Sequence, residues 1–542
     1  MKGNYKLLSS VKAATPVIHA CVALIMGLGG AAHADWTVTN DFSVAENNVS
    51  GVGQASSSLT DGSSFTNQLG IQGRGSVNEY RYNFNVTLKA TDDARNDPEK
   101  ITLGNLQGTL AGGNHAITAG DAFESFSQYT LSTAIKGLSY RYGSSDGAGP
   151  QITLLGGYAY PRWHSFWDRD SAEQKISGIR VRQEVLPDLT IGASVVQQDD
   201  DERFSTESLY QNLVGGIDWE YLPITGLTIK GESAFNDTRE NPFAGAELSY
   251  KGQAHKVEAI GDGGPSRVRL EYENITPDFI SSTGAATPDR EKFKAEWRYR
   301  PVKDTTWRFG FLFYHDNLDG QLAATTDHYR PEVQWIKRNF AGRQQAQLDL
   351  SYKYDNARST GLERDDQLLS AVYRDRVGEV DLDAELGSNF YETSGARDEQ
   401  EMFGNITLTG RKEIGSLILK PSVRAGVWQQ QDELADTRDQ RTEYSIGMGM
   451  DLPDYRVTTV WRLGRNEQNR DESKPVSGVT SLTATDSART FASMSINYRP
   501  ESIAILRDGM LYLRASMNDF TYSLAGKDYA EQSIVAGIKI KL

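Results

Sequence analysis

The sequence has almost no cysteine, no long apolar run after its first residues and no excess of basic side chains. Its one cysteine, Cys21, lies in the apolar middle of the N-terminal segment, which we interpret below as a cleaved leader. A mature chain without cysteine excludes disulfides, thiolate metal sites, iron–sulfur clusters and covalently attached haem. The formal net charge of −15 argues against a nucleic-acid partner, because phosphate binding requires a basic face.

The N-terminal segment "MKGNYKLLSSVKAATPVIHACVALIMGLGGAAHA" has a lysine-bearing start, an apolar middle and small residues at its end. Ala32-His33-Ala34 forms an A-x-A cleavage site, so the pattern predicts a signal peptide over residues 1–34. Cys21 does not fit a lipobox, because the apolar residues follow it instead of preceding it. After the leader no apolar run approaches the ~18 residues of a membrane helix. The mature protein is therefore either soluble outside the cytoplasm or crosses a membrane as a β-barrel.

From about Phe65 onward the sequence reads as strand, turn, strand, with very little helical periodicity. Apolar and polar residues alternate over eight to ten positions in segments such as "QAQLDLSYKY", "GEVDLDAELG", "SRVRLEYE" and "EKFKAEWRYR", which predicts strands with one apolar and one polar face. Strands in soluble sandwiches average about five or six residues, whereas a tilted membrane strand needs about nine to eleven. The segments belong to the longer class.

The chain contains about 26 such candidate strands, within a range of roughly 24 to 28 set by the uncertainty of strand boundaries. Neither a short repeat typical of a solenoid nor a composition break between sandwich domains is present. We therefore predict an all-β fold, a single large antiparallel transmembrane β-barrel over residues 65–542. Residues 35–64, rich in Gly, Ser and Asn, are predicted to be a short flexible lead. A second interpretation of that lead is an extra strand, "WTVTNDFSV", followed by a flexible loop.

Aromatic residues make up 10% of the chain, and many stand at predicted strand ends. A membrane barrel carries aromatic girdles at its two interfaces. We expect the following residues to belong to them: Trp163, Trp167, Trp219, Tyr221, Tyr299 and Tyr498.

The chain ends on a regular strand, "IVAGIKIKL", whose apolar side continues to the last residue. This tail resembles the C-terminal signal of Gram-negative outer-membrane barrel proteins, with Gly537, Ile540 and Leu542 at the matching positions. It departs from that pattern at Val535, where a polar residue is usual, and at Leu542, where an aromatic residue is usual. The resemblance implies a porin-like protein of the outer membrane, surrounded by lipid and lipopolysaccharide and inserted by the barrel-assembly machinery. The last strand is then expected to pair with the first and so leave no open edge in lipid.

A second stretch, Thr118 to Gly143, is similar to part of the pore of fimbrial ushers. Gly120, Asp121 and Gly137 carry the likeness. The chain is too short to hold the plug and flanking domains of an usher, so we interpret the stretch as a hairpin of a large barrel.

Catalytic and metal-binding patterns are weak. "GSSDG" fits the G-x-S-x-G elbow around Ser145, but a strand follows it where that motif requires a helix. No histidine of the mature chain has a partner at metal-ligand spacing; these are His115, His164, His255, His315 and His328. We therefore predict that the protein is not an enzyme and has no cofactor and no metal.

Two loops leave alternatives open. The acidic loop Gln197 to Phe204 is either solvated or a cation site near lipopolysaccharide. The aromatic loop Tyr160 to Asp170 either anchors the protein at the interface or binds a partner or glycan.

The polar faces of the predicted strands carry charged runs of both signs. Charged walls of this kind line aqueous pores, although they could equally pair with each other or with an inserted partner. The basic candidates for the lumen are Arg267, Arg269, Lys292, Lys294, Arg298 and Arg300, with Arg308 continuing the run, and the acidic ones are Glu379, Asp381, Asp383 and Glu385.

Two functions follow from this architecture. The first is a wide transport conduit for a solute, a polymer or a protein. The second is a sheath that holds a multihaem cytochrome or another partner protein across the outer membrane. Barrels of 16 to 18 strands already leave an open channel, so a barrel of about 26 strands with a short lead should need a lumen-filling or periplasmic partner.

Overall fold

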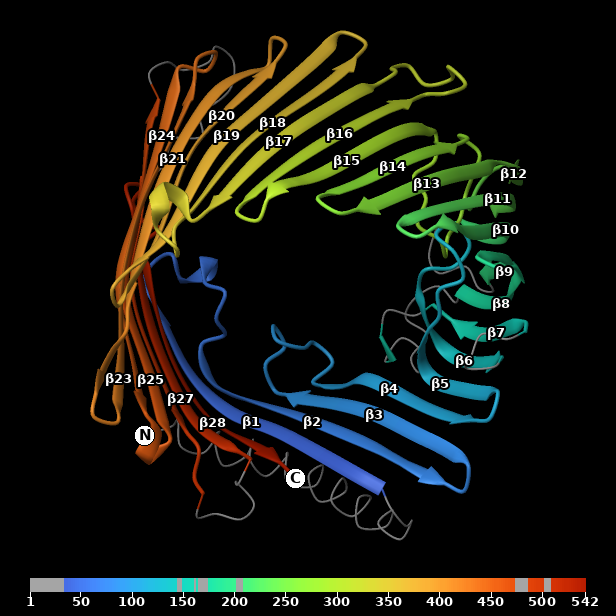
Figure 1. Ribbon diagram of the computed structural model, residues 1–542. Helices are drawn as coiled ribbons and strands as arrows, with labels where there is room; N and C mark the ends of the chain where they lie inside the picture. Colours follow the sequence, from blue (N-terminus) through green and yellow to red (C-terminus); the bar gives the residue numbers. More distant parts are fainter. Residues whose placement is uncertain are drawn as a thin grey trace.

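The computed structural model is a single closed β-barrel (Figure 1). It describes residues 34–143, 149–159, 162–163, 174–200, 208–472, 486–501 and 508–542. Within these residues the regular elements are 28 strands and three 3₁₀ turns. No helix of the described part is long and apolar enough to cross a membrane.

The strands follow one another along the chain. The first fourteen are β1 (Ala34–Ser50), β2 (Gly62–Val77), β3 (Tyr80–Thr91), β4 (Ile101–Gly112), β5 (His115–Phe123), β6 (Ala134–Tyr142), β7 (Gln151–Tyr158), β8 (Gln174–Leu186), β9 (Leu189–Asp200), β10 (Leu209–Ile224), β11 (Leu227–Asn241), β12 (Leu248–Tyr250), β13 (Gln253–Gly263) and β14 (Ser266–Ile275). The others are β15 (Arg290–Val302), β16 (Thr305–Asp316), β17 (Asp327–Arg338), β18 (Gln347–Ser359), β19 (Leu362–Val377), β20 (Val380–Thr393), β21 (Arg397–Gly410), β22 (Lys412–Ile414), β23 (Leu417–Asp432), β24 (Thr437–Leu452), β25 (Val457–Glu472), β26 (Ser487–Tyr498), β27 (Met510–Tyr522) and β28 (Tyr529–Lys541). The 3₁₀ turns are η1 (Gln54–Ser56), η2 (Phe340–Gly342) and η3 (Pro453–Tyr455).

Each strand pairs antiparallel with its neighbours in sequence, and β28 returns to pair with β1. Two short strands, β12 and β22, do not occupy ring positions of their own. β12 pairs with β11, which also pairs with β13. β22 pairs with β23, which also pairs with β21. The 28 strands of the described chain, less these two, give a ring of 26. The prediction of an all-β fold, one large antiparallel barrel of about 26 strands, is confirmed.

Closure of the ring uses the chain to its last residue. Twelve residue pairs join the strands, from Thr39 opposite Lys541 to Ser50 opposite Ala530. Beyond them, Leu542 and Val38 exchange two backbone hydrogen bonds of 2.8 Å each. The apolar tail therefore completes the ladder, as the sequence predicts.

The barrel begins earlier than predicted. We expected a flexible lead over 35–64 and a first strand near Phe65, but β1 occupies Ala34–Ser50 and is hydrogen-bonded to both β2 and β28. The extra strand followed by a loop, our second interpretation, is what the structure has. The polar composition of the segment concealed a strand because half of its residues face the lumen. Residues 1–33, the greater part of the predicted signal peptide, lie outside the described residues.

The two ends of the barrel differ in the length of their connections. At one end most turns are short, with positive-φ residues such as Asn78, Gly226 and Gly378. At the other end the chain makes long connections, among them 51–61 and 276–289. Outer-membrane barrels have short periplasmic turns and longer extracellular loops, so the short-turn end, where β1 begins and β28 ends, is periplasmic.

The outer surface is apolar and carries aromatic rings. Tyr272 is 43% exposed on the outer side of β14, and on β15 and β16 the ring of Trp297 stacks on Tyr299 and Phe309 with centroids 5.5 and 5.1 Å apart. Trp219, Tyr221 and Tyr498 lie on the same face near the short-turn end. These rings form the girdle that membrane barrels place at an interface.

We expect deletion of Gly537–Leu542 to abolish assembly, because it removes the register pairs of Gly537 to Lys541 and the last two hydrogen bonds of the closing strand. Unpaired backbone groups in lipid cost several kcal/mol each. The measurement is the amount of heat-modifiable protein in the outer-membrane fraction, where unboiled and boiled samples run differently on a gel. Leu542→Phe, which restores the usual terminal aromatic, is the control and should assemble normally. Normal levels of the truncated protein would contradict the closing role.

Candidate functional site: the lumenal wall

Alternation along each strand turns one set of side chains to the lumen. On β14 the outward Leu270 and Tyr272 are each 43% exposed, whereas the inward Glu271 and Glu273 are 6% and 3% exposed. Acidic groups this deeply buried require partners. The lumenal wall is therefore an interacting surface instead of a simple solvated face.

A lattice of ion pairs covers the inner side of β13, β14 and β15. Glu271 contacts the Nζ atoms of Lys256 and Lys292 at 3.3 and 3.1 Å and the Nη2 atom of Arg269 at 3.2 Å. Lys292 also contacts Glu273 at 3.0 Å. Each charge of this group thus has an opposite charge on the same or an adjoining strand.

The lattice extends to the other side of Arg269. Its guanidinium lies 2.9 Å from Glu258 and 3.8 Å from Glu296, and Glu296 also contacts Lys294 at 2.6 Å. Three of the predicted basic candidates, Arg269, Lys292 and Lys294, are therefore neutralised by carboxylates.

The remaining arginines of the basic run form a separate row. Arg267, Arg298 and Arg308 are register partners on β14, β15 and β16. Arg267 approaches Asp262 at 3.9 Å, and Arg308 donates a hydrogen bond of 3.0 Å to Gln334. Arg298, between them, has no ion pair or side-chain hydrogen bond within the described residues. We call these three residues the arginine row. Arg300, the last of the candidates, is exposed near the short turn, where its backbone N–H donates to Pro265.

The acidic run is also paired locally. Asp383 contacts Arg374 at 2.8 Å, Asp381 contacts Arg376 at 3.6 Å, and Glu385 accepts a hydrogen bond of 2.9 Å from Asn405. Glu379, by contrast, lies in the turn between β19 and β20 and pairs with Lys412 at 3.3 Å.

Two connections from the long-loop end fold against the inside of the wall. One joins β5 to β6 (residues 124–133), and the other joins β14 to β15 (residues 276–289). They bind each other, because Ser132 N–H donates to Thr283 O at 2.8 Å and Thr283 Oγ1 donates to Thr130 O at 2.6 Å. We call the pair of segments the inner shelf. In Figure 1 the β5–β6 connection runs along the inner side of the wall near β8 to β11.

The inner shelf is fastened by two glutamates, the half-buried Glu232 and the buried Glu273. Glu232 accepts hydrogen bonds from the backbone N–H groups of Gln128 and Tyr129 at 3.1 and 2.8 Å. Glu273 accepts from the hydroxyl of Tyr129 at 3.0 Å. Burial first, and then the neighbouring Glu273, raise the pKa of the Tyr129 phenol far above its usual range, so Tyr129 remains a neutral donor.

Beneath the shelf the lumenal wall becomes apolar. Phe126 packs with Ile176 and Val196 in one cluster. Tyr129 and Phe279 pack on a second cluster, whose wall residues are Val214, Ala234, Ala254 and Ile275. Burying these groups removes apolar surface from water and supplies the main stabilisation of the shelf.

Sequence reasoning missed the shelf. Its signal was present, since Val196, Val214 and Ala234 place apolar side chains on the face of the strands that is polar elsewhere. From the sequence alone these single apolar residues on three strands cannot be recognised as one cluster, because only the pairing register of the strands shows that they are neighbours.

The usher-like stretch, Thr118 to Gly143, includes parts of the strands β5 and β6 and the segment of the inner shelf that joins them. Gly120 has φ +96°, and a Cβ there would lie 2.0 Å from Leu106 O, so the close approach of β4 and β5 requires glycine. Asp121 accepts hydrogen bonds of 2.7 Å from Leu106 N and from Trp163 Nε1 and lies 3.1 Å from Lys136 Nζ. The hairpin prediction holds for the strands β5 and β6, but ten residues of inner shelf separate them.

Trp163 is not a girdle residue, contrary to our expectation. It is 6% exposed, and its indole N–H donates to Asp121. The hydrogen bond to a carboxylate of the wall fixes the ring away from lipid. Trp167, Ser145, His164 and most of the acidic and aromatic loops lie outside the described residues.

Two histidines have acidic partners that spacing along the chain does not indicate. His315 lies 2.7 Å from Asp327 and the buried His328 2.6 Å from Asp355, each across a strand connection. Within the described residues no group of three or more metal-ligating side chains could hold a metal ion.

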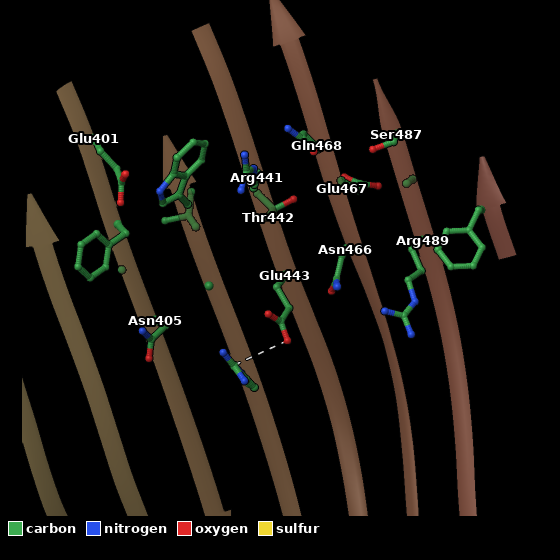
Figure 2. Close-up of a pocket in the computed structure, with 18 of the residues that line it drawn as sticks. Glu401, Asn405, Arg441, Thr442, Glu443, Asn466, Glu467, Gln468, Ser487 and Arg489 are labelled. Atoms are coloured by element: carbon green, nitrogen blue, oxygen red, sulfur yellow. Dashed lines mark ion pairs between the residues drawn. The ribbon is translucent and has the colours of Figure 1, made fainter. Parts of the chain in front are cut away.

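A groove opens in the wall formed by β21 and β23 to β27 (Figure 2). Its volume is about 640 Å³. One register row across it consists of Phe403, Trp428, Arg441, Gln468 and Ser487, and the next consists of Asn405, Gly426, Glu443, Asn466, Arg489 and Phe520. We call this the aromatic groove. In the ring it lies half a turn away from the inner shelf.

Comparison with protein families gives one match. Residues 22–311, more than half of the chain, match the family described as the S-layer protein SlpA, β-barrel domain. The chain belongs to this family. A search of curated proteins finds no matching relative.

Solved barrels resemble this family member in fold alone. The translocation pore of the P pilus usher PapC is 10% identical, with 93% of this chain and 99% of the usher chain covered and a TM-score of 0.41. Wzi of Escherichia coli, an outer-membrane carbohydrate-binding barrel, is 14% identical over 62% of this chain and 84% of its own, with a TM-score of 0.33. OccK2 of Pseudomonas aeruginosa is 12% identical over 94% and 98%, with a TM-score of 0.28.

The location follows from the physics of the barrel. A closed ladder with an apolar, aromatic outer face and a polar lumen is stable in a lipid bilayer, because every backbone group finds its partner within the ring. The protein is an outer-membrane β-barrel, as predicted.

We expect Glu232→Ala to release the inner shelf while the barrel persists. The substitution leaves two backbone N–H groups without acceptors, at roughly 1–3 kcal/mol each. Limited proteolysis of the detergent-solubilised protein should then cut within 124–133, whereas the wild type resists. Glu220→Ala, on the neighbouring strand β10 and paired only with exposed or half-exposed cations, is the control and should resist like the wild type. Equal protection of both variants would show that Glu232 does not hold the shelf.

Proposed function

We propose that the protein is a wide aqueous conduit through the outer membrane, without enzymatic activity. The observation that carries this proposal is the size of the closed ring. With strands about 4.8 Å apart and tilted by about 40°, 26 strands close into a ring roughly 50 Å across between backbones. The inner shelf lies flat against the wall of β8 to β14, so it narrows such a lumen from one side.

The charges of the lumen support passage of polar cargo. The ion-pair lattice neutralises most carboxylates and lysines of the β13 to β15 wall. In the arginine row, by contrast, only Arg267 has an ion pair within the described residues, the 3.9 Å contact with Asp262. Since this row lies near the short-turn end, it would favour anions at the periplasmic mouth.

A second candidate function is structural. The match to the barrel domain of an S-layer protein supports a role as the membrane-embedded part of a surface layer. The same width supports a sheath around a partner protein, our alternative from the sequence, with a multihaem cytochrome as one such partner. Lipopolysaccharide, the barrel-assembly machinery and a lumen-filling or periplasmic protein are the partners that these proposals imply.

We expect the purified barrel to conduct ions in planar bilayers with a large single-channel conductance, because a lumen of this width holds water. Protein isolated from its native host under mild conditions tests the sheath, since a bound partner should then co-purify and lower the conductance. An isolated barrel that stays silent without any partner would contradict the conduit.

We expect Arg267→Gln, Arg298→Gln and Arg308→Gln together to shift the selectivity of the channel toward cations. Within the described residues Arg298 and Arg308 have no ion pair, and Arg267 has only the 3.9 Å contact with Asp262. The control is Lys292→Gln with Lys294→Gln, which should shift the selectivity less because each lysine is balanced by a glutamate. The reversal potential in a salt gradient is the measurement. A larger shift in the lysine pair would show that the arginine row does not set selectivity.

A further inference from the structure

The aromatic groove combines rings, amides and arginines in an arrangement unlike the rest of the described wall. Around Arg269 and Glu271 the charged groups contact one another. In the aromatic groove the two register rows leave a cavity of about 640 Å³, within the range of small-molecule sites.

A glycine makes the space. Gly426 stands between Asn405 and Glu443 in its row, so the floor has no side chain at its centre. A Cβ built there would meet Asn405 Cβ and Gly404 O at 3.6 Å each, ordinary contact distances. The strand therefore does not need glycine for its own packing, and a larger side chain would extend into the groove.

Aromatic rings stand at both ends of the groove. Phe403 and Trp428 lie on β21 and β23, and Phe520 lies on β27. Trp428 and Phe520 are four strand spacings apart, or about 19 Å. An elongated ligand of several rings, each with an apolar face, fits this spacing. Amide and hydroxyl groups lie between the ends, from Asn466, Gln468 and Ser487 (Figure 2).

Two of the charged side chains that line the groove, Arg489 and Glu401, have no ion pair within the described residues, whereas the others are paired. Glu443 is shared by Arg424 at 3.7 Å and Arg462 at 3.4 Å. Arg441 stacks over Trp428 at 4.1 Å and contacts Asp439 at 3.4 Å.

Among the described residues, Arg489 is the cation of the groove that has no carboxylate beside it. Its Nε and Nη2 groups donate to the amide oxygen of Asn518 at 3.1 and 2.8 Å, and it lies over the rings of Phe491 and Phe520. In the part of the chain that the structure describes, no carboxylate lies within ion-pair distance of it. Stacking fixes the guanidinium plane, so its free N–H groups are preorganised for a carboxylate.

A buried acceptor also lacks its donor. Asn466 stands beside Arg489 in the row, and its Oδ1 atom is buried with no hydrogen-bond partner among the described residues. Buried polar atoms normally have partners. A hydroxyl of a bound molecule, after a small rotation of this amide, would supply the missing donor.

We propose that the aromatic groove binds an acidic oligosaccharide, with a sugar carboxylate on Arg489, ring faces on the aromatic side chains and hydroxyls on the amides. Aromatic rings pack on the apolar faces of sugar rings, and an arginine without a neighbouring carboxylate favours a sugar that carries one. This inference deepens the proposed function, because the ligand reaches the groove from the lumen. The groove lies near the long-loop end of its strands, since Trp428 is close to the end of β23 and Ser487 begins β26.

The test is calorimetric titration of the full-length barrel in detergent with a tetramer of galacturonate, and with maltotetraose as the neutral probe. We expect the acidic tetramer to bind about tenfold or more tightly than the neutral one, since a charge-assisted hydrogen bond separates them. Arg489→Gln should abolish this difference. Arg514→Gln is the matched control, because Arg514 also lies on the lumenal side of β27 over a ring, that of Tyr512, but outside the groove.

A second variant distinguishes the loss of the binding site from misfolding of the barrel. Gly426→Leu should fill the groove and remove binding of both probes while heat-modifiability stays normal. Equal affinity for the two probes, or unchanged binding by Gly426→Leu, would overturn the proposal. A further titration uses an acidic lipopolysaccharide in micelles. If the barrel bound this lipopolysaccharide but not the free tetramer, the proposal that the lumen binds free oligosaccharide chains would be wrong. The titration does not require the barrel to conduct ions. A barrel that conducts no ions but still binds the tetramer would therefore contradict the proposed conduit and leave the proposed binding site standing.

Discussion

The structure depends on one constraint: in lipid, every backbone N–H and C=O group must find a partner within the protein. An antiparallel meander meets it only when its last strand pairs with its first. This is why the chain is ordered in a strand to Leu542, whose two hydrogen bonds to Val38 end the ladder. It also explains why the polar segment after Ala34 is the first strand of the barrel. A flexible lead there would have left one edge of β28 unpaired, because its other edge pairs with β27.

Closure of the ring gives the two faces of the wall different surroundings. The outer face is apolar because lipid surrounds it, and the inner face is free to carry charge. Those charges are arranged as neighbours across strands: Glu271 lies among Lys256, Lys292 and Arg269, and Asp383 lies beside Arg374. Pairing across strands removes most of the cost of placing charged groups on a low-dielectric wall.

The wall departs from this rule in three places, and each departure has a consequence. Beneath the inner shelf it turns apolar, which holds two loops flat against the lumen. At the arginine row it leaves like charges side by side, which suits a mobile anion. At the aromatic groove it omits a side chain at Gly426, and among the described residues no carboxylate pairs with Arg489. The shelf and the groove lie on opposite sides of the ring, so one wall is occupied by the protein itself and the other is open to a ligand.

The sequence by itself determined the fold class, the number of strands and the closing role of the tail, because period-two alternation and strand length follow directly from the two environments of a membrane wall. It also placed Arg269, Lys292 and Asp383 on the polar face. What it could not decide was which of these charges are compensated, since that depends on register. In the described part of the chain Arg298 has no ion pair, while Lys292 contacts two glutamates. The inner shelf, the position of Trp163 and the groove around Gly426 were likewise decided only by the tertiary structure, because each unites single residues from strands that are distant in sequence and adjacent only in the closed ring.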